Sequence, residues 1–196
     1  MTPVPAEQPL APLERRLVMV RGVLDDEVAG RAAAELMTLD ATGDGPVTMY
    51  LDAAGGTLEA AFTLMDTIDL LGVPVNAVCV GRVEGPAVGV VAVASHRVAG
   101  AHTRFRLCEP EARAEGRASE LEQWVRHHQA RLAQFTGRLA QVTGWPAEHV
   151  EADLAAGRYL SAGEAVRYRL IDEVLHPAGG ASPLGGGRPF GFRPSH

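Results

Sequence analysis

Cysteine, serine and histidine are the residue types through which this chain could carry out nucleophilic chemistry. Cys108 is the first candidate nucleophile, and His96 and His102 are the candidates for its general base. A thiolate attacks a carbonyl carbon efficiently only when a matched base and an oxyanion hole accompany it. A lone cysteine at a strand end is far more often an inert, partly buried thiol. The first expectation is therefore that Cys108 does no chemistry.

Two further pairs of adjacent residues, one serine–histidine and one histidine–histidine, lack the spacing that catalysis or metal binding requires. Ser95 and His96 are adjacent, and adjacent side chains on regular backbone seldom face each other, so a turn is expected there. His127 and His128 are also adjacent, whereas metal ligands on a helix are four residues apart. We therefore expect neither a metal site nor a cofactor, and His128 is expected to be a packed histidine.

Apolar runs of strand length alternate with patterns of helical period around these residues. The predicted strands lie at 17–20, 47–51, 75–80, 104–108 and 171–175. Asp26 is expected to cap the first helix, and the second strand leads into a glycine turn at 54–56. The alternation predicts an α/β fold with a mainly parallel sheet and crossover helices.

One long helix is predicted over 118–143, where apolar residues recur at spacings of three and four. The stripe consists of Leu121, Val125, His128, Leu132, Phe135, Leu139 and Val142. Such a stripe needs a partner wherever the monomer does not cover it. Ser161 and Glu164 fit a capping box at the start of a later, short helix.

Proline and glycine mark the expected limits of the folded domain. Four prolines among the first residues predict a flexible arm over 1–13, because proline removes amide donors. Glycine and proline are dense again over 177–196, which is expected to be a disordered tail. A single domain is therefore expected over 14–176.

Composition restricts the partners that the protein can have. The net charge is -6, so the chain lacks the excess of positive charge with which proteins hold the phosphates of nucleic acid. No run approaches the roughly 20 apolar residues that cross a bilayer, and the first residues have no signal-peptide pattern. Cys79 and Cys108 suit a reducing compartment as thiols. We expect a cytoplasmic protein that binds neither nucleic acid nor membrane.

Several motifs, taken in order, resemble the proteolytic subunit family of the Clp protease. Residues 51–56 resemble its strand ending in Asn-Ser-Pro-Gly-Gly, and 66–68 resemble Asp-Thr-Met. Residues 158–162 resemble Arg-Phe-Leu-Ser-Ala, and 164–166 and 170–172 resemble Glu-Ala-Val and Leu-Val-Asp. The resemblance runs from about Leu13 to His176. It implies a ClpP/crotonase-like α/β spiral of ββα units, with the long helix as a projecting handle.

The catalytic residues of that family are missing at the matching positions. Gly85 stands where the family has its nucleophilic serine, Cys108 stands for the general-base histidine, and Gly157 stands for the orienting aspartate. Pro86 follows the nucleophile position, where the family uses a backbone amide as an oxyanion donor, and proline has no amide hydrogen. Gly55 and Gly56 are a remnant of the oxyanion loop, although a tight turn also requires glycine.

These losses predict a pseudo-peptidase, a ClpP-like subunit with a structural or regulatory role in a ring. The resemblance implies a heptamer, or a tetradecamer of stacked rings, formed by this chain alone or with an active ClpP relative. The segment before Leu13 lacks a recognisable gating segment, which counts against docking of a Clp ATPase. Two alternatives are an active ATP-dependent peptidase of serine or cysteine type and a crotonase-like acyl-CoA binding protein.

Charged residues over 111–115 replace the glycine-rich stretch with which the family lines up peptide and joins its rings. We expect a solvated loop there, because alternating charges usually face water. The alternative is a changed contact between rings.

Overall fold

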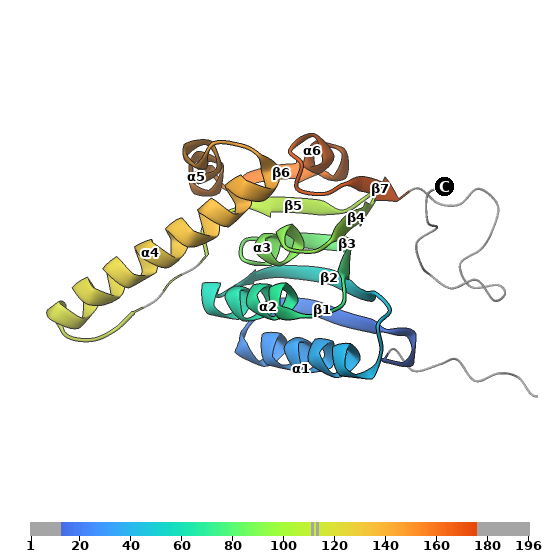
Figure 1. Cartoon of the computed structure of the whole chain (residues 1–196). Coiled ribbons are helices and arrows are strands. Elements are labelled where there is room, and N and C mark those ends of the chain that lie inside the picture. Colours follow the sequence, from blue (N-terminus) through green and yellow to red (C-terminus); the bar gives the residue numbers. More distant parts are fainter. Residues whose placement is uncertain (1–12, 111, 113, 176–196) are drawn as a thin grey trace, which may run out of the picture.

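The computed structural model describes residues 13–110, 112 and 114–175 (Figure 1). The predicted arm over 1–13, except Leu13, and the predicted tail over 177–196 lie outside these residues and stay predictions. In the described part, helices and a mostly parallel sheet alternate along the chain. The α/β class predicted from the sequence is therefore confirmed.

Three long parallel strands form one side of the sheet, with the first of them at its edge. They are β1 (Leu17–Leu24), β2 (Val47–Gly56) and β3 (Val75–Glu84). Leu51 is the register partner of Val20 on one side and of Cys79 on the other. All three side chains are fully buried, so the aliphatic runs seen in the sequence form the core. β2 continues as a strand through the expected glycine turn at 54–56.

The sheet divides beyond β3, which pairs with two different strands along its length. Its first half is parallel to β4 (His96–Gly100), and its last residues are parallel to β5 (Arg104–Leu107). β4 in turn pairs with β7 (Glu173–Leu175), and β5 pairs antiparallel with β6 (Arg158–Ser161). The last residues of β3 and of β5 consequently lie side by side.

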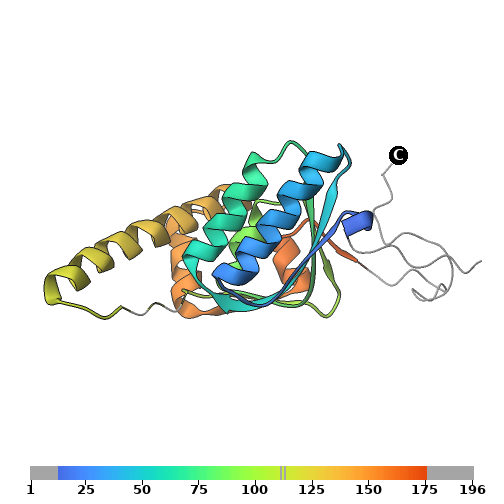
Figure 2. The same ribbon diagram turned by 90° about the horizontal axis from the view of Figure 1, so that it is seen from below.

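Helices α1 (Asp26–Thr42), α2 (Leu58–Leu70) and α3 (Ala87–Ala92) lie beside the strands that precede them, and Figure 2 shows α1 and α2 on the same side of the sheet. The cap of α1 is Asp25, whose carboxylate accepts the Val28 amide at 2.9 Å. The prediction that Asp26 is the cap was wrong by one residue, because Asp26 already has helical geometry. Thr57 caps α2 in the same way.

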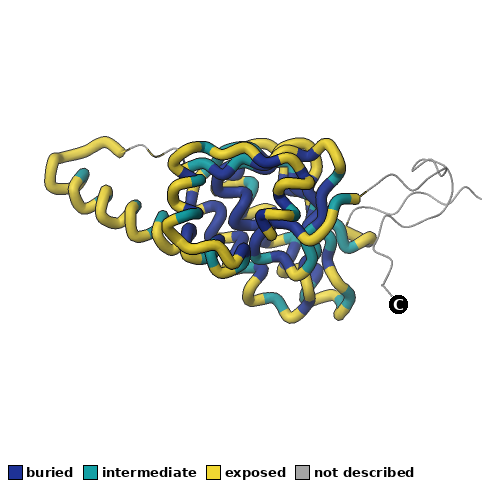
Figure 3. The backbone as a smooth tube through the Cα atoms, turned by 90° about the horizontal axis from the view of Figure 1, so that it is seen from above, coloured by how far each residue is buried: buried dark blue, intermediate teal, exposed yellow. Residues whose placement is uncertain are grey.

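The handle helix α4 spans Ala118–Thr143, with the predicted bounds. Only its second half packs on the body: Phe135 and Leu139 are buried, and the Phe135 ring meets Phe62 edge-on at 6.4 Å. The first half extends away from the sheet and is mostly exposed (Figures 1 and 3). The stripe is therefore not continuously covered by the described residues.

His128 differs from the packed histidine that was expected. It is half-buried on the projecting half of α4, where its ring stacks on Trp124 with 4.9 Å between ring centroids. Val125 on the same stripe is 44% exposed.

The remaining elements surround β6. α5 (Ala147–Ala156) follows α4, and α6 (Ala162–Arg167) follows β6. The Ser161–Glu164 capping box is confirmed, with the Ser161 amide and hydroxyl both donating to Glu164 Oε2 at 2.8 and 2.6 Å. α5 and β4 were not predicted, and the turn expected at Ser95–His96 already begins β4 at His96.

Candidate functional site

Gly85 and Cys108, which are far apart in the sequence, lie against each other at the ends of β3 and β5. The Gly85 amide donates to the Arg106 carbonyl at 2.9 Å, which continues the pairing of the two strands. A Cβ atom on Gly85 would lie 3.5 Å from Cys108 Sγ. Side chains at these two positions would therefore be in direct contact.

Gly157 belongs to the same corner of the molecule. The antiparallel register of β5 and β6 ends with Leu107 paired to Arg158, and Gly157 and Cys108 are the next residues beyond this pair. Gly157 ends α5 in the left-handed conformation, with φ 65°. A Cβ atom there would lie 3.2 Å from Arg106 Nη2. A carboxylate at this position would therefore meet a guanidinium group before it reached position 108.

Between them, these three positions offer no hydroxyl, imidazole or carboxylate. Gly85 and Gly157 have no side chain, and the half-buried Cys108 contributes a thiol. Neither cysteine of the chain forms a disulfide. Cys79 is fully buried in the core, and burial raises the pKa of its thiol far above the usual range, so it stays protonated and inert.

His96 and His102 are remote from Cys108. His96 is paired with Asn76 at the start of β3, whereas Cys108 follows the row of Glu84 at its end, about 25 Å away at the usual rise per residue. The His96 ring instead lies between Asp172 and Glu173, at 3.5 and 3.4 Å. His102 precedes β5 and Cys108 follows it, a separation of about 20 Å. The alternative in which either histidine acts as the base for Cys108 does not agree with this geometry.

Packing determines the conformation of the glycines that end β2. Gly56 has φ 124°, and a Cβ atom there would overlap the Leu24 carbonyl at the end of β1. Gly56 must therefore be glycine whether or not an oxyanion binds, while a Cβ atom on Gly55 would meet open space. Pro86, the N-cap residue of α3, has no amide hydrogen to donate.

A hollow of about 170 Å³ lies beside this corner, between the start of α2 and the handle helix. It is lined by Thr57, Leu58, Glu59, Pro110, Ala112, Trp124 and His128. Sequence reasoning did not single out this hollow, although the spacing of four between Trp124 and His128 was a visible signal that the two rings share one face of the helix.

A parallel α/β sheet, a glycine loop that leads from a strand into a helix, and a long projecting helix define the class of protein to which this chain belongs. The family model of the Clp protease matches residues 9–178. The chain therefore belongs to the Clp protease family and has a ClpP-like fold.

No helix of the described residues is long and apolar enough to cross a membrane. The same residues contain no cluster of three or more histidine, cysteine or acidic side chains that could hold a metal ion.

Restoring the hydroxyl alone is expected to leave the protein inactive. Gly85→Ser places an Oγ atom beside Cys108 without a base, an orienting carboxylate or the Pro86 amide, so neither peptide turnover nor fluorophosphonate labelling should appear. Gly85 has φ 57°, so the substitution should cost about 1–2 kcal/mol of stability. Gly85→Ala is the matched control, because it adds the same strain without the hydroxyl. Labelling of Gly85→Ser, but not of Gly85→Ala, would reveal a general base other than the groups assigned here among residues 13–110, 112 and 114–175.

Proposed function

We propose that this chain is a catalytically inactive, ClpP-like subunit with a structural or regulatory role in a peptidase ring. The observation that carries the proposal is the convergence of Gly85, Cys108 and Gly157 at one corner, where the family's nucleophile, base and orienter are expected. The residues at these three positions, two glycines and a cysteine, support the proposal because none supplies a hydroxyl, an imidazole or a carboxylate.

The size of the expected loss supports inactivity. A serine nucleophile, its base and the orienting carboxylate act as one unit, so losing any member removes most of the rate that the unit supplies. Loss of one oxyanion donor costs a further factor of about 10² to 10³. Because Pro86 removes a donor as well, a single compensating side chain could not restore the chemistry.

The surfaces left exposed in the single chain support an assembly role. Met19 and Val23 on β1 are 47% and 57% exposed, and Met37 on α1 and Leu70 on α2 are 61% and 85% exposed. The projecting half of α4 adds Val125 and the Trp124–His128 stack. Members of this family typically form rings, and large apolar side chains gathered on several faces are best covered by neighbouring subunits.

The partners in this proposal are other copies of the chain, in a heptamer or tetradecamer, or an active ClpP relative in a mixed ring. Docking of a Clp ATPase is not part of it, because residues 1–12 show no recognisable gating segment. Nucleic acid and membrane are not proposed as partners either, and a cytoplasmic location fits two reduced cysteines.

Particle mass and mixing test this role. We expect the purified chain to form a ring-sized particle by light scattering, and to change the peptidase activity of an active Clp subunit from the same cell when the two are co-assembled. A chain that stays monomeric at all concentrations, and leaves the active subunit's mass and turnover unchanged, would contradict the proposed role.

A further inference from the structure

Two arginines lie next to each other on neighbouring strands of the sheet. The parallel register of β3 and β5 pairs Arg82 with Arg104, and the β5–β6 register continues the row to Ser161. Both arginine side chains are exposed. Neighbouring strands are about 4.8 Å apart, and like charges directly opposite each other destabilise a sheet. The guanidinium groups of Arg82 and Arg104 are therefore expected to repel each other.

The next row along the same strands has no such conflict. Glu84 on β3 lies opposite Arg106 on β5, and the Arg106 guanidinium lies over the Tyr159 ring at 5.1 Å. Glu84 and Arg106 have opposite charges, so this row has no like-charge repulsion. The like-charged row on these strands is that of Arg82 and Arg104.

The carboxylates near this row on the same surface are engaged by other groups. Asp52 accepts the Arg82 backbone amide at 3.1 Å and lies 3.8 Å from Arg21. Glu164 Oε2 accepts hydrogen bonds from the amide and the hydroxyl of Ser161. Among the described residues, no carboxylate lies within salt-bridge distance of the guanidinium group of Arg82 or of Arg104.

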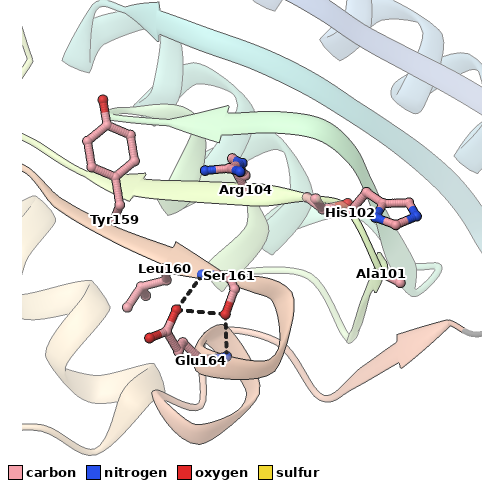
Figure 4. A pocket seen from close by; sticks show the side chains of 8 residues that line it. Ala101, His102, Arg104, Tyr159, Leu160, Ser161 and Glu164 are labelled. Atoms are coloured by element: carbon pink, nitrogen blue, oxygen red, sulfur yellow. Dashed lines mark hydrogen bonds between the residues drawn. The ribbon is translucent and has the colours of Figure 1, made fainter.

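A hollow of about 360 Å³ adjoins Arg104 (Figure 4). The turn that carries His102 and Thr103 forms one side of it, Tyr159 and Ser161 of β6 form another, and the Glu164 carboxylate, which accepts from Ser161, also lines it. Tyr159 is 61% exposed, and the Arg106 guanidinium lies over its ring. The site combines a recess lined by Arg104, large enough for one or two side chains, with Arg82 on the neighbouring strand.

We propose that Arg82 and Arg104, together with the recess beside Tyr159, bind a short acidic peptide segment of a partner protein. Guanidinium groups bind carboxylates in a bidentate manner, and a carboxylate placed between the two arginines turns their repulsion into attraction. A nucleic acid fits less well, because the whole chain carries a net charge of -6 and would repel a long polyanion. A short acidic segment needs only the local positive charge. This inference does not depend on the absence of peptidase activity.

Fluorescence anisotropy with fluorescein-labelled hexaglutamate tests the site, with labelled hexaglutamine as the uncharged control. We expect the intact chain to bind hexaglutamate at low salt and to lose most of that binding in 0.3 M NaCl, because exposed charges are screened. Arg82→Gln/Arg104→Gln should weaken binding at least tenfold. Arg31→Gln/Arg126→Gln removes two exposed arginines from α1 and α4 and should leave binding unchanged. Both double variants have the same net charge, so any difference in their binding reports where the removed arginines lie.

Thermal unfolding and particle mass are recorded for the same samples. Arg82→Gln/Arg104→Gln should fold as well as the intact chain, because it removes a repulsion. Equal weakening in the two double variants would overturn the proposal, since binding would then follow net charge alone. Displacement of hexaglutamate by inorganic phosphate at matched ionic strength would also overturn it, in favour of a simple anion site. A lower particle mass in Arg82→Gln/Arg104→Gln without peptide binding by the intact chain would assign the arginines to a contact between copies.

Discussion

Gly56→Ala is expected to prevent the chain from accumulating in folded form. The alanine Cβ atom would overlap the Leu24 carbonyl, and φ 124° is a conformation that residues with a side chain rarely adopt. The obstacle is the backbone of β1, which is held in register with β2 and cannot rotate away as a flexible side chain would. Strain and overpacking together should cost about 3–5 kcal/mol, a large part of the stability of a domain of this size. Soluble yield and circular dichroism measure the result.

Gly30→Ala provides the matched control for that prediction. Gly30 lies within α1, and a Cβ atom there would meet open space. Alanine has the higher helix propensity, so the free energy of unfolding should rise by about 0.5–1 kcal/mol. If Gly56→Ala folded as well as Gly30→Ala, the backbone of β1 would not lie as close to Gly56 as it does in this structure. Packing would then not explain the glycine, and oxyanion binding would again be a reason for it.

Phe135→Ala is expected to detach the handle helix from the body. Phe135 is fully buried, meets Phe62 at 6.4 Å, and lies so close to Gly89 of α3 that a Cβ atom on Gly89 would overlap its ring. Removing it opens a cavity between three helices and should lower the free energy of unfolding by about 3–5 kcal/mol. Urea denaturation followed by tryptophan fluorescence reports the change, because Trp124 lies on the handle.

Val125→Ala separates packing within one chain from packing between chains. Val125 is 44% exposed on the projecting half of α4, so its loss should change the stability of the single chain by less than about 0.5 kcal/mol. It should nevertheless reduce the particle mass if the handle joins subunits. Equal stability losses for Phe135→Ala and Val125→Ala would mean that the first half of α4 does not project as it does in this structure.

The fold was predictable where local signals and long-range packing agree. The helix over 118–143 was predicted with its observed bounds, because its apolar residues recur at spacings of three and four along the whole element. The cap of α1 was misplaced because Asp25 and Asp26 are equally good caps in isolation, and only the backbone geometry separates them. β4 was missed because it has only five residues and begins with His96 and Arg97, so its apolar run is too short to be recognised.

Motif order alone selected Gly85, Cys108 and Gly157 as the candidate site, and the structure places Gly85 beside Cys108. The neighbours of those residues come from strand pairing, which the sequence does not encode locally. Arg106 lies beside Gly157 because β5 and β6 are antiparallel, and Arg82 meets Arg104 because β3 changes partner halfway along its length. The pairing of Cys108 with either histidine does not agree with the structure, because His96 begins β4 and His102 precedes β5, whereas Cys108 follows β5.

Turnover of a fluorogenic peptide by the purified chain, with particle mass measured on the same sample, tests the proposed inactivity. We expect a ring-sized particle whose turnover cannot be distinguished from the buffer blank. Robust turnover by the chain alone that is unaffected by Cys108→Ala would contradict it, because the nucleophile would then lie outside the corner formed by Gly85, Cys108 and Gly157.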